Sequence, residues 1–92
     1  MAKLYIVSAA GSVIVRDYAK LNRYRMAWTR GYDAGFTDTE LDADGVESER
    51  VVAAATETSI EYASAQGATG PGSIMEVGYY AGFIAARELL LA

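Results

Sequence analysis

The first third of the chain has two patterns in succession: a continuous apolar run, and then apolar positions at helical spacing. Residues 3–10, KLYIVSAA, are almost unbroken apolar and rich in β-branched and aromatic side chains, which predicts a strand covered on both faces. Residues 12–16, SVIVR, fit either a second strand in a hairpin or the entry to a helix. Residues 17–30 have apolar positions every three or four residues, which predicts a helix that starts at Asp17 and stops at Gly31.

The rest of the chain is ambiguous in its middle and clear at its end. Residues 34–41 fit a short strand or an irregular crossing, and DADG at 42–45 predicts a turn. Residues 46–65 fit either one long helix, favoured by the alanines, or a central strand RVVAAAT followed by a loop, favoured by the paired valines. A glycine-rich loop at 64–72 then precedes a predicted helix over 73–91.

One short sequence occurs twice, as GYDAGF at 31–36 and GYYAGF at 78–83. Each copy has two glycines four positions apart, and on a helix such a pair leaves a smooth face that another backbone can approach closely. Two short matches do not make a repeat architecture. They indicate tight helix packing, or a face for a second subunit or another partner.

Composition narrows the possible functions. The chain of 92 residues is expected to form a single domain, 1–92, and its 52% apolar content in so short a length favours self-association. It contains neither cysteine nor histidine, so any acid–base or nucleophilic work falls to carboxylates, tyrosines, serines or lysines. The net charge of −4 argues against binding to a nucleic-acid duplex.

The C-terminal apolar run, residues 74–92, is about as long as a membrane span. It contains Glu76, Arg87 and Glu88, which are costly in lipid. The first residues also lack the basic region and long apolar stretch of a signal peptide. We therefore expect a cytoplasmic protein whose C-terminal helix is buried or lies at a subunit interface.

The stretch GPGSIMEVGYYAG, residues 70–82, holds the clearest candidate chemistry. Ser73 and Glu76 have the spacing of a capping box, which begins many helices. A glycine-rich loop before a helix is also an anion site, and the helix dipole favours an ionised Glu76 that could act as a nucleophile. No metal is expected: ELDADG matches the first half of a calcium loop, but Val51 stands where the loop needs glutamate.

Residues 72–82, GSIMEVGYYAG, resemble the signature of the nucleoside 2-deoxyribosyltransferases and the related deoxynucleotide N-glycosidases. Residues 3–11, KLYIVSAAG, are similar to the first strand of that family, and residues 41–57 are similar to its middle segment. The resemblance implies a small α/β fold: a Rossmann-like or flavodoxin-like parallel sheet with flanking helices, short of the last strand or strands. It also implies an assembly in which neighbouring subunits complete each site.

The resemblance also implies roles for residues at the matching positions. Glu76 would be the nucleophile that attacks the anomeric carbon of a deoxyribosyl group, forming a covalent intermediate as in retaining glycosidases. Asp42 would contact or protonate the base, and Tyr5 would position the nucleophile. No cofactor is needed for this chemistry.

Three further residues would bind the substrate, a deoxynucleoside or deoxynucleotide. Gly72 and Ser73 would line the pocket for the sugar or its 5′-phosphate. Asp44 would take the place beside the base if Asp42 does not.

Three functions therefore compete. The first is an enzyme that cleaves or transfers the N-glycosidic bond of a deoxynucleoside or deoxynucleotide. The second is a small acidic, mainly helical interaction protein without catalysis, such as a phage-like inhibitor or assembly factor, which forms a dimer or higher homo-oligomer through its C-terminal helix. The third is a nucleotide-binding protein that has lost turnover.

Overall fold

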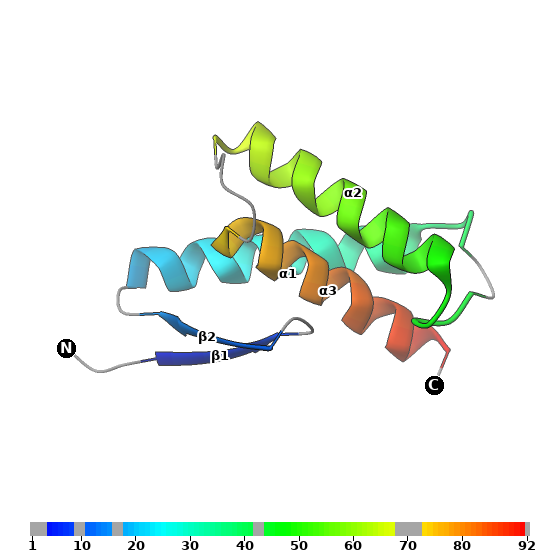
Figure 1. Ribbon diagram of the computed structural model, residues 1–92, viewed down its shortest axis with the longest axis horizontal. Helices are drawn as coiled ribbons and strands as arrows, with labels where there is room; N and C mark the ends of the chain where they lie inside the picture. The colour runs from blue at the N-terminus through cyan, green and yellow to red at the C-terminus, as the bar shows by residue number, and fades with distance from the viewer. Residues whose placement is uncertain (1–3, 9–10, 16–17, 42–43, 68–72, 92) are drawn as a thin grey trace.

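The computed structural model describes residues 4–8, 11–15, 18–41, 44–67 and 73–91. In chain order, this part contains β1 (Leu4–Ser8), β2 (Gly11–Val15), α1 (Tyr18–Thr37), α2 (Glu49–Ala65) and α3 (Ile74–Leu90), as Figure 1 shows. The two strands pair antiparallel, with Leu4 opposite Val15 and Ser8 opposite Gly11.

The helices form the body of the molecule, which measures 43 × 26 × 18 Å. α1 and α3 lie side by side and run in the same direction, while α2 returns across them in the opposite direction (Figure 1). The hairpin lies on the side of the α1–α3 pair away from α2, where β1 contacts α3 and β2 contacts α1.

The predicted Rossmann-like or flavodoxin-like fold is wrong. In the described part of the chain the sheet has two antiparallel strands, and the buried core comes from the three helices and the loop after α1. A parallel sheet needs strands joined by crossover connections. Here the hairpin is followed by three helices in succession, so no such crossover forms within the described ranges.

The segment expected to supply a central strand is helical because its small residues pack with a period of four. Val51, Ala55, Ser59 and Ala63 are all buried in α2, while Val52 is 40% exposed. A buried central strand would hide both valines, but a helix turns them to different sides. The high helix propensity of the alanines therefore outweighs the β preference of two valines.

The helix predicted to stop at Gly31 continues to Thr37. Gly31 and Gly35 do not end α1, because both are buried against α3 in the middle of the helix pair. A Cβ at Gly31 would overlap the carbonyl group of Tyr79. The glycine is needed for close approach, and the helix tolerates its lower helix propensity.

The two repeated sequences meet each other, and together they form what we call the glycine seam: Gly31 and Gly35 of α1 with Gly78 and Gly82 of α3. A Cβ at Gly35 would lie 2.6 Å from the carbonyl oxygen of Phe83, and one at Gly78 would lie 2.8 Å from that of Tyr24. The expectation of tight helix packing is confirmed. The four glycines are covered by the facing helix of the same chain. They therefore do not form the surface for a second subunit or another partner that the sequence also allowed.

α3 is the central element, which explains its apolar sequence. Its side chains Tyr79, Phe83 and Ile84 share one core cluster with Val51 and Ala55 of α2. Across the described residues, no helix combines the length and hydropathy that crossing a membrane requires. The apolar run at 74–92 therefore corresponds to a helix that is covered by its neighbours along most of its length.

Candidate functional site

Ser73 and Glu76 start α3 as a helix cap. Ser73 is the N-cap residue, and its hydroxyl accepts a hydrogen bond of 3.2 Å from the backbone N–H of Glu76. The Glu76 side chain is half-buried in the first turn, where the helix dipole stabilises a carboxylate. The Ser73 half of the capping box is therefore confirmed, but among the described residues the Glu76 side chain makes no hydrogen bond back to Ser73.

Of the other predicted site residues, Asp44 is the one whose side chain the structure describes, and it lies far from Glu76. Asp44 lies before α2, with its carboxylate 3.1 Å from Nη1 of Arg50 and its carbonyl oxygen 3.3 Å from Nη2 of Arg87. Arg87 is three turns of α3 beyond Glu76, roughly 16 Å along the helix axis. Asp44 and Glu76 thus lie at opposite ends of α3.

Three predicted positions cannot be placed as side chains. Asp42 and Gly72 lie outside the described residues, and Tyr5 is described only through its backbone in β1. In the described ranges, no group of three or more aspartates and glutamates could hold a metal ion.

A groove of about 430 Å³ lies between α1 and α2. It exists because α2 diverges from α1 toward its C-terminal end (Figure 1). Seven residues line it, from the three helices and from the residue that follows α2: Met26, Arg30, Asp33, Ala34, Tyr62, Gln66 and Tyr79. This volume is within the range of small-molecule sites, roughly 300 to 1,000 Å³.

The groove has an aromatic wall and a charged edge. The rings of Tyr62 and Tyr79 stack with their centroids 5.1 Å apart. Arg30 and Asp33 are exposed and one helical turn apart on α1, and neither side chain has an ion pair or hydrogen bond within the described residues. The groove therefore presents a flat apolar surface beside one positive and one negative charge.

A second surface runs along the other side of α1. Trp28, Tyr32 and Phe36 stack in sequence, with ring centroids 5.1 and 6.2 Å apart. This stack of rings ends at Phe36, which is 49% exposed. Because α1 and α3 run in the same direction and Gly35 meets Phe83, the last turn of α1, which includes Phe36, lies toward the C-terminal end of α3.

Further exposed apolar side chains lie at the end of α3. Leu89, Leu90 and Leu91 are 57%, 41% and 44% exposed. We call these three leucines and Phe36 the apolar end.

No family model, curated protein or solved structure matches this chain.

The predicted deoxyribosyltransferase-like function is wrong, because the chain does not adopt the fold on which it depended. That function required a parallel sheet whose edge brings the base-binding aspartate and the tyrosine to Glu76. The segment that should supply the central strand is instead α2, and the helices form the core. The prediction of a deoxynucleoside or deoxynucleotide substrate depended on the same activity.

The most prominent buried polar residue, Arg87, was noted in the sequence only as a residue costly in lipid. It is 1% exposed, and its guanidinium donates to four backbone carbonyl groups of α1 and the following loop. Nη1 reaches those of Gly35 and Asp38 at 3.3 Å, and Nη2 reaches those of Leu41 at 2.8 Å and Asp44 at 3.3 Å. A lone arginine inside an apolar helix was the signal for this role.

Proposed function

We propose that the protein is a small acidic helical interaction module that self-associates through the end of its C-terminal helix and performs no catalysis. The apolar end carries this proposal. Single exposed apolar residues are common on soluble proteins, but contiguous ones mark interaction surfaces. Successive residues on a helix point to different sides, so Leu89, Leu90 and Leu91 together surround the end of α3, while Phe36 is exposed in the last turn of α1.

The size of the domain supports association. A chain of 92 residues buries a smaller share of its surface than a longer one, so covering exposed apolar groups in a second copy gives proportionally more stabilisation. The glycine seam is already filled within the chain and is not free for that contact, whereas the apolar end is exposed. A role as an inhibitor or assembly factor, and a cytoplasmic location, remain predictions that belong to this proposal.

Sedimentation equilibrium of the wild-type protein from about 10 μM to about 1 mM tests the proposal over the range of weak to moderate affinity. We expect the average mass to rise with concentration. A double variant, Phe36→Ser with Leu89→Ser, should stay monomeric because it removes apolar area from both helices at the apolar end.

The matched control is a double variant on the outer face of α2, Val52→Ser with Ile60→Ser, at residues that are 40% and 47% exposed. It removes comparable exposed apolar area and should associate like the wild type. A wild type that is monomeric at every concentration contradicts the proposal. So does an apolar-end variant that still associates, or a control that dissociates equally.

A further inference from the structure

The groove between α1 and α2 is held open by its surroundings. The glycine seam fixes α1 against α3, and Val51, Ala55, Ser59 and Ala63 fix α2 against the rest of the core. The Tyr62–Tyr79 stack then joins α2 to α3 beside the groove. Because each wall is anchored in the core, the groove does not depend on a ligand to form it.

The two charges at the edge of the groove are available to a ligand. Opposite charges three residues apart on a helix commonly pair with each other. Arg30 and Asp33 have that spacing and both border the groove, yet they form no ion pair with each other or with any other described residue. A guanidinium and a carboxylate placed in this way can each meet an opposite charge on one small molecule.

The aromatic wall has unused hydrogen-bonding capacity as well. Neither the Tyr62 hydroxyl nor the Tyr79 hydroxyl has a hydrogen bond to another described residue. Tyrosine rings stack well on planar apolar groups, and their hydroxyls prefer a polar partner nearby. The amide of Gln66 adds a donor and an acceptor at the same opening.

We propose that this groove binds a small aromatic zwitterion, of which a free aromatic amino acid is the simplest example. Its carboxylate meets the Arg30 guanidinium, its ammonium group meets the Asp33 carboxylate, and its ring packs on the Tyr62–Tyr79 wall. Arginine suits a carboxylate because its planar fork can donate two parallel hydrogen bonds. The site is separate from the apolar end, so this binding is independent of self-association.

Titration of the ¹⁵N-labelled protein with phenylalanine, followed by amide chemical shifts, tests the proposal. We expect saturable shifts at Ala34, Gln66 and Tyr79, and none at Leu89. N-acetylphenylalanine lacks the ammonium group and phenylalaninamide lacks the carboxylate, so each should bind about tenfold more weakly. Absence of shifts up to about 10 mM phenylalanine overturns the proposal. Equal binding of all three compounds overturns the zwitterion requirement.

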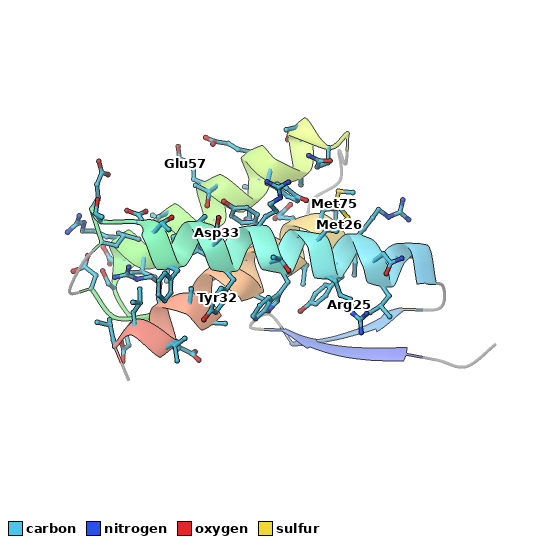
Figure 2. All side chains as sticks on the ribbon, turned by 180° about the vertical axis from the view of Figure 1, so that it is seen from behind. Arg25, Met26, Tyr32, Asp33, Glu57 and Met75 are labelled. Carbon is cyan, nitrogen blue, oxygen red and sulfur yellow. The ribbon has the colours of Figure 1, made fainter. Side chains whose placement is uncertain are left out.

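Substitutions on α1 locate the site. Arg30→Ala and Asp33→Asn should each weaken phenylalanine binding about tenfold. Arg25→Ala is the matched control, because Arg25 is an exposed arginine of the same helix that lies on the side of the hairpin (Figure 2). It borders a different hollow, together with Tyr24, Trp28 and Thr29. Equal weakening in the Arg25 and Arg30 variants would show non-specific charge attraction and overturn the assignment. Unchanged binding in the Arg30 and Asp33 variants would overturn it too.

Discussion

Gly35 of α1 lies directly against the backbone of Phe83 of α3: a Cβ atom added at Gly35 would stand 2.6 Å from the Phe83 carbonyl oxygen and 3.0 Å from its Cα. The hydrogen atom of the glycine therefore sets the distance between the two helices. Gly78 makes the reciprocal contact with the Tyr24 carbonyl, at 2.8 Å for the added Cβ. The parallel pairing of α1 and α3 depends on both helices contributing glycines to the same line.

The glycine seam predicts that Gly35→Ala destabilises the protein, although alanine is the better helix former. The added methyl must push against backbone, which cannot rotate away as a side chain can. Overpacking of this kind costs about 1 to 3 kcal/mol, and the gain in helix propensity offsets about 1 kcal/mol of that cost. Urea denaturation followed by circular dichroism measures the difference in the free energy of unfolding.

Gly45→Ala is the control for that measurement. Its added Cβ would meet only Oε2 of Glu47, at 2.9 Å, and this flexible side chain can move away. We expect a change within about 0.5 kcal/mol. A Gly35→Ala variant that is as stable as the wild type, or no less stable than Gly45→Ala, would show that the close helix contact does not limit stability.

Arg87→Lys should cost about 3 kcal/mol or more, even though it keeps the charge. The guanidinium spans four carbonyl groups through two nitrogen atoms, and a single ammonium cannot reach all of them. Each carbonyl that is left buried without a donor adds a desolvation cost. The measurement is again the free energy of unfolding in urea.

Arg23→Lys is the matched substitution at an exposed position on α1. Its free energy of unfolding should stay within about 0.5 kcal/mol of the wild type. Similar losses in both variants would mean that the bonds of Arg87 to the loop after α1 add nothing to stability.

Local patterns in the sequence predicted the elements that local forces decide. The helix over 73–91 is present as α3, Ser73 is its N-cap, and the two glycine pairs do mark tight packing. These features depend on helix periodicity and capping, which act within a few residues. Such features can therefore be predicted from the sequence alone.

Features that depend on distant partners were not predictable in this way. Whether Gly31 ends a helix or packs inside one is decided by Tyr79, which is far along the chain. The groove combines Arg30, Tyr62 and Tyr79 from three helices, and no short motif joins them. The carbonyl groups that meet Arg87 likewise come from α1 and the following loop, so only the lone arginine itself was visible.

Substitutions at the start of α3 test how much Ser73 and Glu76 stabilise the first turn of the helix. Ser73→Ala should cost about 1 kcal/mol, because the N–H of Glu76 loses its acceptor. Glu76→Gln should cost less, about 0.3 to 1 kcal/mol, because it removes only the charge that favours the helix dipole. Thermal denaturation at low ionic strength measures both. A Glu76→Gln variant that is more stable than the wild type would indicate that the carboxylate is held at an unfavourable position, which a capping role does not explain.

Tyr24 gives the protein a distinct response to alkaline pH. Its ring is 6% exposed beneath α3, and burial raises the pKa of its hydroxyl above the ordinary value of 10.0, because the charged phenolate is poorly solvated there. A raised folded-state pKa means that the folded form keeps the proton more strongly than the unfolded form. The resulting stabilisation is complete below about pH 10 and is lost as the pH rises through the higher folded-state pKa.

Ultraviolet absorbance of tyrosinate during an alkaline titration measures this effect. We expect a late step in the folded protein that is absent in Tyr24→Phe and absent from the wild type unfolded in urea. Unfolding should follow that step, because ionisation of Tyr24 places a charge inside the α1–α3 contact. A Tyr24→Phe variant that keeps the late step would assign that step to another tyrosine and contradict the prediction.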